Sequence, residues 1–110
     1  MTTTFPYQNP NLPIPDRVAD LLTRMTQDEK LAQMTIFSLP GDHLRDSEEG
    51  PVDVDVLRQQ LPHSVGGIGR VGLYRGSRET AVAANAIQHY AIHETRLGIP
   101  ILIIDEALHG

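Results

Sequence analysis

Near its end the chain carries an unbroken apolar run that leads directly into charged residues. The run is Ile101 to Ile104, and it is followed by Asp105 and Glu106. Because no polar residue alternates with the apolar ones, the pattern predicts a strand covered on both faces, as in a parallel sheet. Neighbouring parallel strands need a long crossover between them, which is usually a helix. This segment therefore favours an α/β fold.

The residues before this run have the features of such a crossover. Ser77 begins a long predicted helix over residues 77–95, which Gly98 is expected to end. Its predicted apolar stripe consists of Ala81, Ala84, Ile87 and Ala91, flanked by Val82 and Tyr90. A glycine-rich segment with β-branched residues precedes the helix, and we predict a strand over residues 65–71. Strand, helix and a last strand over 100–104 form a βαβ unit with a right-handed crossover.

The first half of the chain predicts shorter elements. Residues 1–15 contain four prolines, which indicate an extended lead-in. An amphipathic helix begins at Asp16, with Val18, Leu21, Leu22 and Met25 on one stripe. We therefore expect two regions, a proline-rich lead-in over 1–15 and a folded α/β region over 16–110.

Cap signals define two further helices. The tetrapeptide from Thr26 to Glu29 matches the capping box and begins a helix over 27–34, expected to turn Leu31 and Met34 inward. A buried strand is predicted within residues 34–40. Either Asp53 or Asp55 caps another short helix that ends before Pro62.

Composition excludes several classes of function. With 9 basic against 14 acidic residues and a net charge of −5, the chain lacks the clustered cations that a nucleic-acid partner requires. There is no cysteine, so disulfides and thiolate metal sites are excluded. No apolar run approaches the ~18 residues of a membrane span, so no membrane partner is expected. The first residues do not resemble a signal peptide, and a cytoplasmic location is the default expectation.

Two motifs resemble known sites but lack the required context. Residues 67–72 match G-x-G-x-x-G, yet the predicted helix starts several residues too late for the glycines to open it. Residues 105–109 resemble H-E-x-x-H with Asp105 in place of the first histidine, and they follow a strand, so no metal site is predicted. His89 and His93 are one helical turn apart, but without a third ligand we interpret them as an exposed face.

The candidate site is the end of the last strand. In parallel α/β folds, ligands bind at the carboxyl ends of the strands, where Asp105 and Glu106 are placed. Burying carboxylates is unfavourable unless donors pair with them, and polyhydroxyl ligands supply many donors. We therefore predict that Asp105, Glu106 and His109 bind substrate. The alternative is that Asp105 only caps the next turn while His109 packs beneath the site.

Three blocks of the sequence closely resemble the N-terminal region of family-3 glycoside hydrolases. They are DRVADLLTRMTQDEKLAQM (16–34), VDVLRQQLPHSVGGIGRVG (54–72) and RETAVAANAIQHYAIHETRLGIPILIIDEALHG (78–110). The resemblance implies the N-terminal part of a (β/α)8 TIM-type barrel with parallel strands, incomplete in this chain. It also implies a retaining, exo-acting β-glycosidase that needs no cofactor.

The resemblance further assigns roles to residues. Glu106 matches the family position that accepts hydrogen bonds from hydroxyls of the terminal sugar, whereas the nucleophilic aspartate and the acid/base glutamate are expected downstream of residue 110. The implied partners are a β-linked glucoside, xyloside or oligosaccharide and the remainder of the enzyme chain. The alternative is a catalytically inactive remnant with only a structural or docking role.

Overall fold

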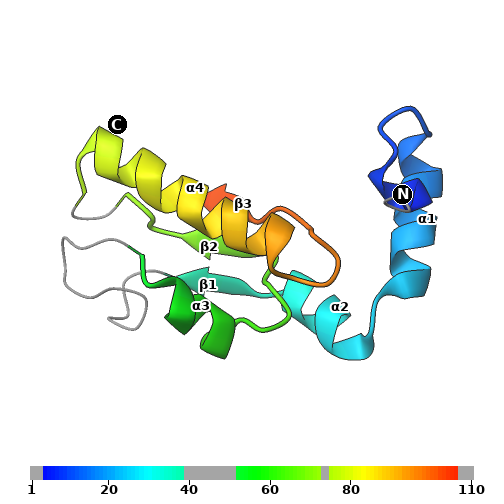
Figure 1. Ribbon diagram of the computed structural model, residues 1–110, viewed down its shortest axis with the longest axis horizontal. Helices are drawn as coiled ribbons and strands as arrows, with labels where there is room; N and C mark the ends of the chain where they lie inside the picture. The colour runs from blue at the N-terminus through cyan, green and yellow to red at the C-terminus, as the bar shows by residue number, and fades with distance from the viewer. Residues whose placement is uncertain (1–3, 39–51, 73–74, 107–110) are drawn as a thin grey trace.

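A computed structural model describes residues 4–38, 52–72 and 75–106 of the chain (Figure 1). Three strands form one parallel sheet in the order β1 (Ile36–Ser38), β2 (Gly67–Gly69) and β3 (Leu102–Ile104). The helices are α1 (Ile14–Arg24), α2 (Gln27–Gln33), α3 (Val54–Gln60) and α4 (Ser77–His93), and a short 3-10 helix, η1, covers Pro6–Gln8. The predicted α/β class and the parallel strand–helix–strand unit at the end of the chain are confirmed.

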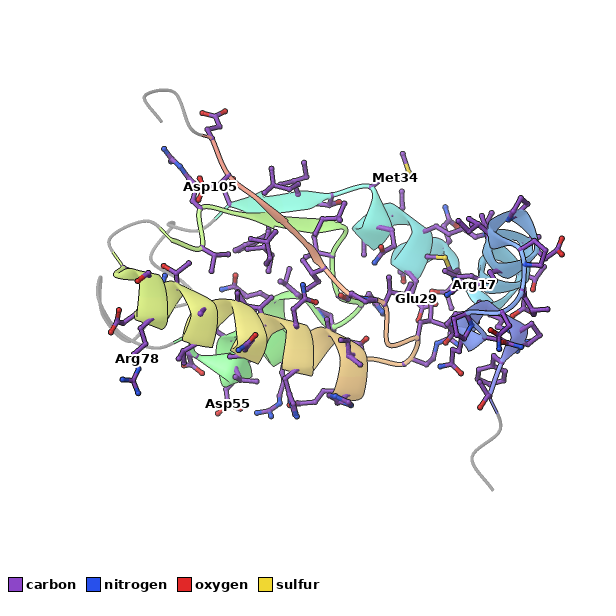
Figure 2. All side chains as sticks on the ribbon, turned by 90° about the horizontal axis from the view of Figure 1, so that it is seen from above. Arg17, Glu29, Met34, Asp55, Arg78 and Asp105 are labelled. Carbon is purple, nitrogen blue, oxygen red and sulfur yellow. The ribbon has the colours of Figure 1, made fainter. Side chains whose placement is uncertain are left out.

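The two helices that connect the strands lie on the same side of the sheet (Figure 2). Side chains alternate between the faces of a strand, so Ile68 in β2 faces the opposite way from Gly67 and Gly69. Ile68 is completely buried and packs in one cluster with Leu57 of α3 and Ile87 of α4. This covered face forms the hydrophobic core.

The other face of the sheet is open within the described residues. The register places Ile36, Gly67 and Leu102 in one row and Ser38, Gly69 and Ile104 in the next. Ile36 is 60% exposed, Leu102 68% and Ile104 37%. The prediction that the last strand is covered on both faces is therefore wrong for residues 102–104. The reason is that β3 lies at a sheet edge and no described element packs on this second face.

Both predicted helix caps are present. The Thr26 hydroxyl accepts a hydrogen bond from the backbone N–H of Glu29 at 3.2 Å, and the Glu29 carboxylate accepts one from the Thr26 N–H at 2.8 Å. Asp53, and not Asp55, caps α3 by accepting from the backbone N–H of Asp55 at 2.8 Å. The capping box located the start of α2, whereas the sequence had left two candidate caps for α3.

Predictions of which helix faces are buried were less accurate. Leu31 and Met34 are 54% and 83% exposed, so the prediction that they point inward is wrong. No described element covers that side of α2. In α4 the buried stripe is Ala83, Ile87, Tyr90 and Ala91, whereas Ala81 and Val82 are exposed. An alanine-rich helix has two adjacent apolar stripes. The stripe that packs in the core begins at Ala83, two residues after the predicted Ala81.

The N-terminal region is held to the connection between α4 and β3. The segment expected to be extended contains η1, and the Tyr7 hydroxyl donates a hydrogen bond to the Leu97 carbonyl at 2.8 Å. The helix α1 begins two residues before the predicted Asp16, because Pro15 is compatible with the first turn of a helix. None of the helices in the described part of the chain has the length and apolar character needed to span a bilayer.

Candidate functional site

The carboxyl ends of the three strands meet at an open cavity of about 470 Å³. All three strands contribute to its lining, which consists of Ile36, Ser38, Gly69, Arg70, Ile104, Asp105 and Glu106. Parallel strands end at the same edge of a sheet, so residues far apart in the sequence converge there. The cavity has a mixed lining, with aliphatic side chains from the open sheet face and charged or hydroxyl groups at the rim.

Asp105 is partly engaged by its own backbone. Its Oδ1 accepts a hydrogen bond from the backbone N–H of Glu106 at 2.9 Å. Its Oδ2 lies beside Gly72, where a Cβ atom would come within 3.9 Å of it. The carboxylate therefore holds the backbone directly after β3, while the residue also lines the cavity.

Glu106 is exposed and lines the same cavity. In the described part of the chain, its carboxylate has no hydrogen bond or ion pair. A carboxylate oxygen can accept several hydrogen bonds, so this group is available to a ligand with donors. His109, the third predicted site residue, lies outside the described residues.

Arg70 and Ser38 line the cavity but were not predicted from the sequence. The Arg70 backbone N–H donates to the Ile104 carbonyl at 3.1 Å, which holds the ends of β2 and β3 together. Ser38 is aligned with Gly69 and Ile104 across the sheet. The signal that identified Asp105, a polar residue at the end of a strand, applies equally to these two residues.

The glycine motif lacks the geometry of a dinucleotide site, whereas residues 107–109 of the other motif lie outside the described residues. Gly67 and Gly69 lie within β2, and α4 begins only at Ser77, so no helix N-terminus opens inside the glycine motif. Gly67 instead permits close packing, since a Cβ there would come within 2.7 Å of the Ile104 Cδ1. In the described part of the chain no group of three potential ligands could hold a metal ion. His89 and His93 lie on the exposed face of α4 as predicted, with their rings 4.7 Å apart.

A second cavity, of about 350 Å³, lies at the amino ends of the strands. It is lined in part by an ion pair in which the Arg96 guanidinium donates to both Glu29 oxygens, at 2.8 and 2.5 Å. This arginine lowers the pKa of the buried Glu29 carboxyl to about 2. The charged groups here are paired with each other, which distinguishes this cavity from the one at the carboxyl edge.

Comparison with known proteins identifies two relatives by sequence. The chain is 33% identical over 107 residues to a putative beta-xylosidase of Formosa agariphila, and 32% identical over 105 residues to Beta-glucosidase C of Emericella nidulans. Each alignment covers 94% of this chain, but the chain spans only 14% and 16% of the lengths of these relatives. No family model matches the chain. The chain is thus related in sequence to a region of two proteins named as glycosidases.

Proposed function

We propose that this chain forms the first part of the catalytic barrel of a family-3 β-glycosidase. The intact enzyme would remove terminal non-reducing β-D-glucosyl or β-D-xylosyl residues from glycosides and oligosaccharides. The observation that carries the proposal is the sequence identity to a putative beta-xylosidase and a Beta-glucosidase over nearly the whole chain. The cavity beside Asp105 and Glu106, at the carboxyl edge of a parallel sheet, is where such a fold binds its substrate.

The arrangement of the sheet supports a barrel. The strand order follows the chain order, and α3 and α4 lie on one side of the sheet (Figure 2). A doubly wound sheet reverses its strand order and places helices on both faces, whereas a (β/α)8 barrel does neither. The exposed side chains of Ile36, Leu102 and Ile104 are then the interior of the barrel, to be covered by side chains of further strands.

Within this proposal Glu106 accepts hydrogen bonds from hydroxyls of the sugar. Its carboxylate lines the cavity and has no partner among the described residues, which supports that role. Asp105 helps to position Glu106, because its Oδ1 accepts a hydrogen bond from the Glu106 backbone N–H. His109 is proposed to orient the loop in which it lies.

The chemical step is assigned to other residues of the intact enzyme. Retaining hydrolysis requires two carboxyl groups about 5–5.5 Å apart on either side of the scissile bond, one acting as nucleophile and one as acid and base. Asp105 is engaged with the backbone of Glu106, so the two neighbours do not form such a pair. We expect the nucleophilic aspartate and the acid/base glutamate beyond residue 110.

The proposal is tested by assaying aryl β-glucosides and aryl β-xylosides. The intact enzyme is expected to hydrolyse at least one of them, while the 110-residue chain alone is expected to show no turnover. In the intact enzyme, Glu106→Ala should lower kcat/KM by roughly 10²-fold, because charge-assisted hydrogen bonds to the sugar are lost. Asp28→Ala, which removes an exposed carboxylate on α2, is the matched control and should leave kcat/KM unchanged.

The alternative function is a non-catalytic docking role for the open apolar face. Absence of turnover by the intact protein on both glycosides would favour this alternative. Turnover by the 110-residue chain alone would instead contradict our placement of the chemistry in other residues.

A further inference from the structure

We infer that Arg70 is a second sugar-binding residue of the carboxyl-edge cavity and that this cavity takes a neutral sugar. In this arrangement a sugar hydroxyl accepts a hydrogen bond from Arg70 and donates one to Glu106. The inference rests on the proposed glycosidase function and deepens it, since it names a further binding residue and the charge class of the substrate.

The backbone fixes Arg70 next to the predicted site. Arg70 directly follows β2, and its N–H donates to the carbonyl of Ile104, the residue immediately before Asp105. Arg70, Asp105 and Glu106 therefore line one cavity although about 35 residues separate Arg70 from the others in the sequence. The short distance between the strand ends places the long arginine side chain within reach of a ligand that contacts Glu106.

The conformation of Arg70 is unfavourable for the backbone. Its φ is +63°, in the left-handed region that residues with a Cβ atom rarely adopt. A glycine would adopt it without strain. In the described part of the chain, the guanidinium has no hydrogen bond or ion pair that offsets this strain. The side chain therefore gives no visible benefit to the fold, which favours a role in binding.

The chemistry of the cavity matches a sugar hydroxyl. A guanidinium only donates hydrogen bonds and a carboxylate only accepts them, whereas a hydroxyl does both. A hydroxyl between Arg70 and Glu106 satisfies both groups, and each bond polarises the other. Ser38 adds a hydroxyl to the same lining.

The charge of the cavity lining indicates whether a neutral or an anionic sugar fits there. Among the described residues, the cavity lining contains two carboxylates, Asp105 and Glu106, against one guanidinium, so the formal charge of this part of the lining is negative. A uronic acid or a sulfated sugar would be repelled by the excess carboxylate, whereas an unmodified sugar would not. The cavity therefore fits a neutral glycone.

The experiment compares two substitutions at Arg70 in the intact enzyme. Arg70→Gly removes the side chain and accepts the left-handed φ, so its thermal unfolding midpoint should be unchanged or higher. Its kcat/KM on an aryl β-glycoside should fall at least tenfold. Arg70→Lys keeps a charged donor and should recover part of that loss. Arg78→Ala is the control, since Arg78 is exposed and projects from α4 on the side away from the sheet (Figure 2), and it should leave kcat/KM unchanged.

Paired substrates test the charge class. The wild-type enzyme should hydrolyse an aryl β-glucoside at least 10²-fold faster, in kcat/KM, than the matching aryl β-glucuronide. A preference for the glucuronide would overturn the assignment of a neutral sugar.

The outcomes separate this inference from the proposed function. If the wild type hydrolyses β-glycosides and Arg70→Gly stays within twofold of it, the role of Arg70 is wrong and the proposed function stands. If the wild type hydrolyses none of the substrates, both are wrong.

Discussion

The two ends of the sheet use charged and polar residues in different ways. At the amino end, Glu29 is buried and held by both nitrogens of the Arg96 fork, and Tyr7 donates to the Leu97 carbonyl. At the carboxyl end, Arg70 and Glu106 are exposed and, among the described residues, their side chains make no hydrogen bond. Polar groups that stabilise a fold are paired within it, because burying them unpaired is unfavourable. Groups without partners at a cavity are available to a ligand.

The largest expected difference in stability is between Ala substitutions at Gly66, directly before β2, and at Gly69, its last residue. A Cβ at Gly66 would lie 2.1 Å from the Gln33 carbonyl oxygen, whereas at Gly69 the nearest atom is the Ile104 oxygen at 3.6 Å. Gly66→Ala should therefore lower the free energy of unfolding by about 3 kcal/mol, since a backbone must shift. Gly69→Ala should change it by less than about 1 kcal/mol. Urea titration of both variants measures the difference, and equal losses would contradict the tight packing at the amino end.

A smaller effect is expected from the buried carboxylate. Glu29→Gln should lower the free energy of unfolding by about 2 kcal/mol, because charge-assisted hydrogen bonds from Arg96 are weakened. The loss is below that of a fully buried ion pair, since the Arg96 side chain is 55% exposed and water screens it. Glu94→Gln is the control, because Glu94 also pairs with an arginine, Arg58, but on the surface. It should not shift the urea midpoint measurably.

The lowered pKa of the Glu29 carboxyl predicts that the stability of the fold depends on pH. The pKa of Glu29 is lowered from 4.5 to about 2, chiefly by the hydrogen bonds from Arg96. A carboxyl with a lower pKa in the folded state stabilises the fold above pH 4.5, and this contribution is lost as the pH falls toward 2. Urea midpoints measured between pH 6 and pH 2 should fall across this window. The fall should be smaller in Glu29→Gln, and an identical fall would assign the effect to other groups.

The smallest expected effect is at the carboxyl edge. Glu106→Gln should change the free energy of unfolding by less than about 0.5 kcal/mol, because the side chain is exposed and unpaired in the described structure. Measured by the same urea titration, a loss comparable to that of Glu29→Gln would show that Glu106 stabilises the fold. Such a result would remove the contrast between the two ends.

Local sequence patterns predicted the elements well and their surroundings poorly. The capping box at Thr26 was found, and the cap of α3 was narrowed to Asp53 or Asp55, because each involves residues within three positions of one another. The exposure of Met34 and Leu102 was not predicted, because burial depends on which surfaces meet. The identity of an apolar residue does not show which part of the protein will cover its side chain.

The candidate site was predicted in part for a similar reason. Asp105 and Glu106 follow an apolar strand, and the end of such a strand is a known location for ligands. Arg70 was missed because its proximity to them depends on the register of β2 against β3. Its left-handed φ was also not predictable, since arginine has no preference for that conformation.

The strand order has a consequence for how the chain assembles. Ile36 is aligned with Gly67, and Gly67 with Leu102, so each new strand joins the one made just before it, after a loop of about thirty residues. The entropy lost on closing each loop is therefore similar for the two described pairings, and neither of them waits for a distant segment. Assembly can follow the order of synthesis on the ribosome, with each strand–helix pair adding to a growing edge.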